Sequence, residues 1–464
     1  MLARAAGRLA DLAQRAVPDP FVIALGLTAL TFALGWWVMP ERTVGGLASA
    51  WFTRFSAQET LTFTAQMALI LVTGAALARA PLVRGLLGRL ADLPRTTASA
   101  AALTAFVAMS TSLINWGFGL VAGAVIAREI GARFSAAGRK LDYPLVAATG
   151  YLGLMIWHGG LSGSAPLKVA EAGPLGGPPI PLGETLGSRM NLALNLLLLV
   201  WVPILVRRMA SPRHERLWPV APLDADEAAA AVTAGAGTAP DTGTVGEEPR
   251  WGRWAGALLG LFAVALGALA LQRAFSAAGF VRGLGLNTFI LLMILVGLLL
   301  FRSPVRYAQA VSGAAGEAGG ILLQFPFYFG LLGLLEASGL VQHLAGGSAG
   351  MAQSLSSLGL PLQWCFDMVT FLTACVVNMF VPSGGGQWAV QGTIVAQAAQ
   401  SLQLPLPRAV MALAWGDQWS NMLQPFWALP LLAITGLKAR DIFGYTLAIM
   451  LASGVFFVLA FALF

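Results

Sequence analysis

Long runs of apolar residues dominate this chain and leave little room for alternating patterns. Uninterrupted apolar runs lie at 21–39, 61–78, 144–157, 190–206, 254–271, 286–301, 320–335 and 442–464. Further stretches that are apolar but interrupted by glycine, proline and polar residues lie at 97–127, 362–400 and 409–437. Because a helix of roughly 20 apolar residues spans a bilayer, the pattern predicts an all-α polytopic membrane protein in which several helices are broken.

The composition agrees with this fold class and excludes others. Of the 464 residues, 57% are hydrophobic and only 11% are charged, whereas about 25% of the residues of soluble domains are charged. We therefore exclude a soluble enzyme, a disordered chain and a nucleic-acid binder, and we expect the lipid bilayer to surround the protein. The net charge of +7 comes from basic residues at the ends of apolar runs, where cytoplasmic loops carry them.

The basic residues also predict the orientation of the chain. With the N-terminus in the cytoplasm, 21 of the 28 Lys and Arg residues fall on the cytoplasmic side and 7 fall outside, as the positive-inside rule requires. A polar segment rich in Pro, Gly, Ala and acidic residues divides the chain. We expect an N-terminal interfacial helix at 1–20, a first membrane repeat at 21–206, a cytoplasmic linker at 207–253, a connecting transmembrane helix at 254–275 and a second membrane repeat at 276–464.

The stretch 97–127 begins and ends on the cytoplasmic side in this topology. A helical path through it measures about 46 Å at 1.5 Å per residue. Going in and out leaves about 23 Å each way, which is less than the ~30 Å thickness of the hydrocarbon core. We therefore predict a re-entrant hairpin that turns inside the membrane at Asn115–Gly119. Non-helical backbone at that depth is tolerated where it is buried in protein or lines a wet cavity.

Four features recur in the same order in both halves of the chain. The pairs are Gln66 and Gln324, Asn115 and Asn378, Ser162 and Ser420, and Pro166 and Pro425, with offsets of 258, 263, 258 and 259 residues. The connecting helix at 254–275 places the second half upside down relative to the first. We therefore predict two inverted-topology repeats with re-entrant hairpins, an architecture that places substrate near the midplane of the membrane between broken helices.

The breaks in these helices form the candidate substrate site. A half-helix that starts inside the membrane presents unpaired N–H groups and the positive end of its dipole, and both attract a carboxylate. The breaks hold polar residues and glycines but no basic residue. We expect substrate to bind at Asn115, Gly117, Gly119, Ser162, Ser164, Asn378, Ser383, Gly384, Gly385, Gln387, Ser420 and Asn421. The alternative is that these polar groups only cap the broken helices.

Two titratable residues at the breaks are candidates for carrying a coupling ion. Asp417 is the acid placed at a break, and His158 is the matching group in the first half. An acid inside the membrane is costly and marks function, so Asp417 could carry a coupling proton. The alternatives are that Asp417 caps the following half-helix and that His158 is a structural residue. Carbonyl groups freed at the breaks, with Asn115 and Asn378, could bind Na⁺ instead. We expect no other metal and no cofactor.

Six tryptophans lie at or beside the breaks rather than at the ends of the spans. They are Trp116, Trp157, Trp388, Trp415, Trp419 and Trp427. Aromatic side chains in such a place could wall an apolar pocket for a short acyl tail, while the polar groups of the breaks hold its head. The alternative is that the tryptophans fill space between helices.

An intramembrane enzyme is one competing class. The sequence Gly160-Leu161-Ser162-Gly163 spells the G-x-S-G of rhomboid-like serine proteases, but that chemistry needs a histidine base within hydrogen-bond reach of the serine. His214 lies in the linker, His343 lies at a helix end, and His158 reaches Ser162 only if a helix continues through two glycines. No H-E-x-x-H, nucleophile elbow or P-loop occurs. We therefore expect a protein that is not an enzyme, and we consider a channel less favoured than a carrier.

Several motifs resemble the bacterial short-chain fatty acid transporter family. They lie at Val17–Pro20, Ile114–Leu120, Gln324–Tyr328, Val381–Trp388 and Gln424–Pro430. The resemblance runs nearly end to end and is weakest in the 207–253 loop. It implies a secondary carrier of the inner membrane whose substrates resemble acetoacetate and butyrate. It also suggests kinship with the broader ion-transporter superfamily, whose members pair two re-entrant hairpins and are often dimers, so we expect a homodimer.

These observations together predict an ion-coupled symporter of short-chain monocarboxylates that works by alternating access. The absence of a buried basic residue at the breaks fits a substrate with a single negative charge. The main alternative is a carrier for another small carboxylate, such as a dicarboxylate. The sequence leaves the coupling ion open between Na⁺ and H⁺.

Overall fold

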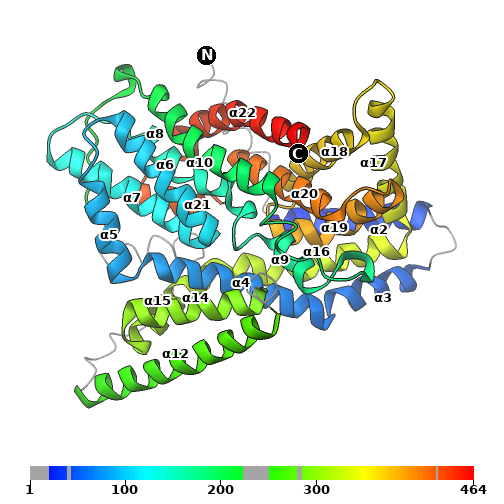
Figure 1. Ribbon diagram of the computed structural model, residues 1–464, viewed down its shortest axis with the longest axis horizontal. Helices are drawn as coiled ribbons and strands as arrows, with labels where there is room; N and C mark the ends of the chain where they lie inside the picture. Colours follow the sequence, from blue (N-terminus) through cyan, green and yellow to red (C-terminus); the bar gives the residue numbers. More distant parts are fainter. Residues whose placement is uncertain (1–19, 39–42, 223–249, 279–284, 425–426) are drawn as a thin grey trace.

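The regular elements of the chain are helices. The computed structural model describes residues 20–38, 43–222, 250–278, 285–424 and 427–464 (Figure 1). Within this part the β contact is an isolated bridge between Leu141 and Arg216. The expected interfacial helix at 1–20 and most of the expected linker at 207–253 lie outside the described residues.

Seven helices of the described part are long and apolar enough to cross a membrane. They include α4 (Gln58–Ala78), α6 (Thr97–Ile114), α10 (Arg189–Met209), Gly256–Ser276 within α12 (Arg250–Ala278), α16 (Gly319–Ala337), α18 (Leu362–Phe380) and α22 (Ala439–Leu463). Shorter apolar helices are α2 (Pro20–Val38) and α14 (Leu286–Phe301). The predicted all-α polytopic membrane protein is therefore confirmed.

The remaining helices connect these spans or form hairpins with them. In the first half they are α3 (Val44–Phe55), α5 (Pro81–Ala91), α7 (Trp116–Ala136), α8 (Tyr143–Gly150) and α9 (Ser164–Glu171). In the second half they are α15 (Pro304–Ala315), α17 (Leu340–Ser356), α19 (Gly384–Ser401), α20 (Leu406–Ser420) and α21 (Leu429–Thr435). Each half thus holds a long helix, a helical hairpin, a broken helix and a final long helix in that order. The inverted relation between the halves stays a prediction.

The predicted hairpin of the first half consists of α6 and α7, which are joined at Asn115. Asn115 ends α6 in extended backbone, and its side chain caps α7 by accepting a 3.0 Å hydrogen bond from the Phe118 N–H. The turn is thus narrower than the predicted Asn115–Gly119. The hairpin is also longer, because α7 continues to Ala136 and its 21 residues measure about 32 Å at 1.5 Å per residue. The estimate of about 23 Å for each leg was therefore too short.

Both hairpin tips lie beside the middle of a long helix. Asn115 Nδ2 donates a 3.0 Å hydrogen bond to the Ile70 carbonyl, halfway along α4. At the tip of the α18–α19 hairpin, Gly386 packs closely against the ring of Tyr328, which lies halfway along α16. A Cβ added to this glycine would lie only 2.6 Å from the ring. Both tips are covered by protein, since Asn115 and Gly386 are buried.

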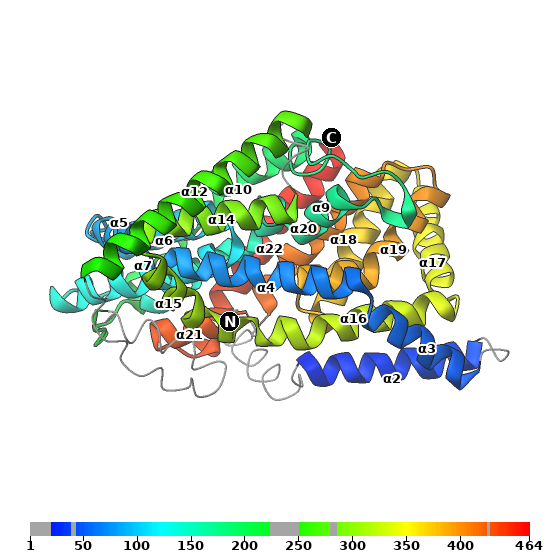
Figure 2. The ribbon, with the colours of Figure 1, turned by 90° about the horizontal axis from the view of Figure 1, so that it is seen from below.

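The connecting helix forms one edge of the molecule. Figure 2 shows α12 along one edge, beside α14, and α2 with α3 along the opposite edge. Only 6% of the apolar window of α12 is buried inside the protein. Its exposed leucines, such as Leu258 and Leu266, therefore fit a helix that faces lipid.

Candidate functional site

All four helix breaks meet at one cavity, which we call the break cavity. Its walls are Met67, Trp116, Leu154, Trp157, Ser164, Ile321, Phe325, Ser383, Gly384, Gly385, Asn421 and Trp427. The predicted site residues Ser164, Ser383, Gly384, Gly385 and Asn421 thus lie together, although they come from three separate breaks. The space open to the centre of a water molecule is about 20 Å³, which suffices for a water rather than for an acyl anion.

The two hairpin tips approach each other through Trp427. The Trp116 ring at the first tip lies 5.0 Å from the Trp427 ring, centroid to centroid, in an edge-to-face arrangement. Trp427 Nε1 donates a 2.6 Å hydrogen bond to the Pro382 carbonyl at the second tip. The Trp116 ring also lies 5.9 Å from the Trp157 ring of the broken helix between α8 and α9. The breaks therefore share one wall of indole rings.

The N-terminus of α19 presents free donors to the break cavity. Gly384 and Gly385 are its first two residues, so their N–H groups have no acceptor within the helix. Within the described part of the chain neither N–H finds another acceptor, since the Ser383 hydroxyl accepts from Gly386. Trp157 Nε1 is also buried without an acceptor. Three N–H donors thus border a cavity whose walls hold no Lys or Arg.

Glycine is required at the start of α19 because aromatic rings lie directly against its backbone. A Cβ added to Gly384 would lie 2.7 Å from atoms of both Trp157 and His158. One added to Gly385 would lie 2.8 Å from the Phe325 ring. Both distances are shorter than van der Waals contact, so any side chain here would displace the cavity wall.

The predicted site residues at and beside the first hairpin tip make contacts within the protein in this structure. Asn115 caps α7, and the Ser162 hydroxyl accepts a 3.0 Å hydrogen bond from the Trp116 N–H. Gly117 packs against Leu71, and Gly119 lies where a Cβ would collide with Ser112. None of these four lines the break cavity. That they hold substrate stays a prediction, and in this structure the side chains of Asn115 and Ser162 already accept from the N-terminal donors of α7.

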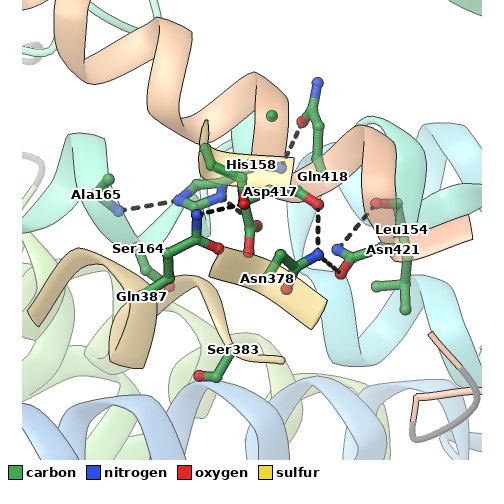
Figure 3. Close-up of polar contacts among 12 residues, drawn as sticks. Leu154, His158, Ser164, Ala165, Asn378, Ser383, Gln387, Asp417, Gln418 and Asn421 are labelled. Atoms are coloured by element: carbon green, nitrogen blue, oxygen red, sulfur yellow. Dashed lines mark hydrogen bonds and ion pairs between the residues drawn. The ribbon is translucent and has the colours of Figure 1, made fainter. Parts of the chain in front are cut away.

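His158 and Asp417 form a fully buried pair behind the cavity. His158 Nδ1 lies 2.7 Å from Asp417 Oδ2, and both side chains are at most 1% exposed. His158 Nε2 accepts a 3.1 Å hydrogen bond from the Ala165 N–H (Figure 3). Since Nε2 is the acceptor, the geometry assigns the imidazole proton to Nδ1, which donates to a carboxylate. With an ionised Asp417 the pair would carry one negative charge, and with a proton on Asp417 Oδ1 it would be neutral.

Three buried oxygens near this pair have no donor. They are Asp417 Oδ1, Asn378 Oδ1 and Gln387 Oε1. The orientation of both amides is fixed, because Asn378 Nδ2 donates to the Asp417 carbonyl and Gln387 Nε2 donates to the Ala374 carbonyl, each at 2.9 Å. In Figure 3 the three side chains point toward one another. Such a set of acceptors suits a proton or a hard cation.

Asn378, Gln387 and Ser420 therefore lie behind the break cavity rather than on its wall. Asn378 Nδ2 lies 2.9 Å from Ser420 Oγ and 3.0 Å from Asn421 Oδ1. Asn421 lines the break cavity and donates to the Leu154 carbonyl at 3.4 Å. The buried pair and the cavity are thus joined through Asn421.

The tryptophans predicted to wall the pocket lie in three different places. Trp116 and Trp157 line the break cavity, whereas Trp388 lines a second cavity described below. Trp415 donates to Asn191 Oδ1 at 3.2 Å and Trp419 donates to the Met450 carbonyl at 2.8 Å. These two rings pack against Phe457, so they fill the space between α20 and α22.

Sequence reasoning missed the apolar wall and one amide. Met67 and Phe325 line the break cavity, and each directly follows a glutamine of the repeated pair Gln66 and Gln324. The repeat could therefore have located both residues. The amide missed was Gln418, whose Oε1 accepts from the N–H groups of His158 and Gly159 at 3.0 and 3.1 Å.

Comparison of the sequence with known proteins gives consistent matches over the full length. The family model described as "Short chain fatty acid transporter" matches residues 1–464. The chain is 38% identical over 468 residues to a protein of Escherichia coli strain K12, covering 100% of both chains. It is 34% identical over 471 residues to a protein of Haemophilus influenzae, covering 99% of both. Both are named "Putative short-chain fatty acid transporter".

Two solved structures share the fold. The crystal structure of the Alcanivorax borkumensis YdaH transporter is 16% identical, with a TM-score of 0.57 over 95% of this chain and 98% of that one. The structure of Neisseria gonorrhoeae MtrF, described among antimetabolite efflux pumps, is 15% identical, with a TM-score of 0.58 over 98% of this chain and 96% of that one. At this identity the likeness shows a transporter fold and nothing about substrate.

Proposed function

Because the chain belongs to the short-chain fatty acid transporter family, we propose that it carries small monocarboxylates such as butyrate or acetoacetate across the bacterial cytoplasmic membrane by ion-coupled symport. The chain is a transporter and not an enzyme. Ser162 of the G-x-S-G sequence is held by the Trp116 N–H, and His158 bonds Asp417 and Ala165 instead of this serine.

The observation that carries the proposal is the set of free donors at the start of α19. The N–H groups of Gly384 and Gly385 and the Trp157 indole N–H border one cavity without an acceptor. A carboxylate satisfies such donors and gains from the positive end of the helix dipole. Met67, Ile321 and Phe325 provide apolar surface for a short acyl tail.

The small volume of the break cavity supports a carrier that must change conformation to admit its substrate. With about 20 Å³ open to a water centre, this conformation is closed around the site. Admitting an acyl anion requires one hairpin to move against the rest. We propose that the two hairpins are re-entrant, since their tips lie beside the middles of α4 and α16, and that two inverted repeats alternate in opening the site to each side.

The buried network around Asp417 supports coupling to a cation. A carboxylate with an oxygen lacking any donor is unfavourable in the protein interior. A proton on Asp417 Oδ1, or Na⁺ between this oxygen and those of Asn378 and Gln387, would satisfy the three acceptors. Because Asn421 bonds Asn378 and also lines the break cavity, substrate and ion would each change the surroundings of the other. We further propose the homodimer and the cytoplasmic N-terminus expected from the sequence.

Counterflow in proteoliposomes tests the substrate. Vesicles loaded with butyrate are expected to accumulate labelled butyrate and acetoacetate more than labelled succinate. A preference for succinate would overturn the monocarboxylate assignment in favour of a dicarboxylate carrier. Trp157→Phe removes one of the three donors and is expected to raise the KM for butyrate, whereas Trp254→Phe, at a 75% exposed position on α12, serves as the matched control.

A further inference from the structure

A second cavity lies next to the break cavity and contains an unpaired lysine. It measures about 350 Å³, and its walls include Arg54, Lys168, Phe329, Glu336, Trp388 and Gln397. We call it the Lys168 cavity. Unlike the break cavity, it is large enough for a small organic anion.

The charges in the Lys168 cavity leave its lysine free. Arg54 and Glu336 neutralise each other through two 2.9 Å hydrogen bonds. Glu171, on the same helix as Lys168, accepts from the Leu286 N–H at 3.1 Å. Glu59 also lines the cavity, at an exposed position at the start of α4, and makes no ion pair with Lys168 within the described residues. Within the described residues Lys168 has no ion pair, and its Nζ lies 5.3 Å from the centroid of the Phe63 ring.

Three helices contribute to both cavities through residues one turn apart. On α9 these are Ser164 and Lys168, on α16 they are Phe325 and Phe329, and on α19 they are Gly385 and Ala389. Because residues four apart share a helix face, the two cavities follow each other along the same three helix faces.

Phe63 fills the space between the cavities. Its ring lies 6.1 Å from Phe325 and 5.9 Å from Phe329, centroid to centroid, and it is fully buried. It is also 3.1 Å from the position of a Cβ on Gly385. One aromatic side chain of α4 thus contacts the walls of both cavities and the free lysine.

We propose that the Lys168 cavity is a second anion site, in which the Lys168 ammonium binds the carboxylate of the substrate before Phe63 moves aside and admits it to the break cavity. This inference rests on the proposed function, because it takes the same monocarboxylate as ligand. It assigns to Lys168 a role in capturing substrate and none in holding it at the break cavity. Removing the charge of Lys168 is therefore expected to raise the KM for butyrate uptake and to change the maximal rate of uptake little.

The test removes the positive charge at position 168 by mutation and then restores it by chemical labelling of the same protein preparation. Lys168→Cys is made in a background with Cys365→Ala and Cys375→Ala, and butyrate uptake is measured before and after labelling. We expect KM to be about fivefold to tenfold higher than with lysine, the size of one partly solvated charge contact. Labelling with aminoethyl methanethiosulfonate is expected to lower KM again, whereas the neutral methyl reagent is expected to leave it high.

Further variants separate this inference from the proposed function. Lys168→Arg should keep the KM of the unmodified protein, and Lys140→Gln, at an exposed position, should not change it. A KM indifferent to the charge at position 168, in a protein that transports butyrate, would overturn this inference alone. Absence of butyrate transport in the unmodified protein would overturn the proposed function and this inference with it.

Discussion

His158 and Asp417 lie 259 residues apart in the sequence and are joined by a 2.7 Å hydrogen bond that solvent does not reach. The bond ties the break between α8 and α9 to α20, so any ion that neutralises Asp417 acts where two broken helices meet. A charged side chain in such a place is expensive and marks function.

Removing the charge of Asp417 should uncouple transport. Asp417→Asn keeps an oxygen acceptor for His158 Nδ1 but carries no charge to be neutralised. We expect accumulation of butyrate driven by an imposed Na⁺ or pH gradient to be lost, while exchange of labelled for unlabelled butyrate persists. Asp92→Asn, at an exposed position, is the control. Gradient-driven accumulation by Asp417→Asn at the normal rate would show that another group carries the ion.

The two hairpin asparagines should behave differently when replaced by alanine. Asn115→Ala removes the cap of α7, so we expect a loss of about 1–2 kcal/mol in stability, the usual cost of a lost helix cap, together with impaired uptake. Asn378→Ala removes an oxygen of the acceptor set, and we expect impaired uptake with a changed dependence on the coupling ion. Membrane insertion should be intact in both.

Thermal unfolding in detergent and uptake at varied Na⁺ and pH separate these effects. Ser303→Ala removes the cap of α15 and provides a matched loss of stability without a change in the site. Normal uptake by both asparagine variants would remove the hairpin tips from the transport mechanism.

Two of the acid–arginine pairs, Asp367–Arg408 and Glu336–Arg54, should contribute unequally to stability. Asp367 is fully buried and lies 2.5 Å from Arg408, whereas the Arg54–Glu336 pair is 41% and 31% exposed. Asp367→Leu removes the carboxylate partner of the mostly buried Arg408 guanidinium, which among the described residues keeps only its bond to the Phe461 carbonyl, so we expect a loss of about 3 kcal/mol, the lower end for a broken buried pair. Glu336→Leu should cost about 0–1 kcal/mol. Equal shifts in melting temperature would contradict this ranking.

Removing the Phe63 ring should open the path between the two cavities. Phe63→Ala is expected to speed the reaction of a cysteine at position 164 with a methanethiosulfonate reagent, because the ring contacts the walls of both cavities. Phe262→Ala, on the exposed face of α12, is the control, and both are compared in a protein lacking its native cysteines. An unchanged labelling rate in Phe63→Ala would show that this ring does not separate the cavities.

The positions of the breaks could be predicted from the sequence because local chemistry determines them. Asn115 ends α6 and caps α7, Ser383 caps α19, and both were expected at a break. Ser164 and Asn421 were also expected there and line the cavity. Short-range capping rules are enough to find Asn115 and Ser383, whereas Ser164 and Asn421 were found as polar residues beside glycines and tryptophans that recur in both halves.

The roles of individual polar residues could not be predicted, because they depend on partners far away in the chain. Ser162 accepts from the N–H of Trp116, 46 residues earlier, and so caps α7. Trp415 bonds Asn191, 224 residues earlier, and faces away from the cavity. Lys168 lines a cavity one helical turn from Ser164, beside residues of α16 and α19 that lie more than 150 residues later in the chain.

Protection of a single cysteine by substrate tests the central claim most directly. Ser383→Cys, at the start of α19 and in a background without Cys365 and Cys375, is labelled with a methanethiosulfonate reagent at rising butyrate concentrations. The account predicts that butyrate slows this labelling over the concentrations that saturate uptake, and that it leaves labelling of Ser354→Cys, on exposed α17, unchanged. Labelling of position 383 that is indifferent to butyrate, in a variant that still transports it, would place the substrate elsewhere.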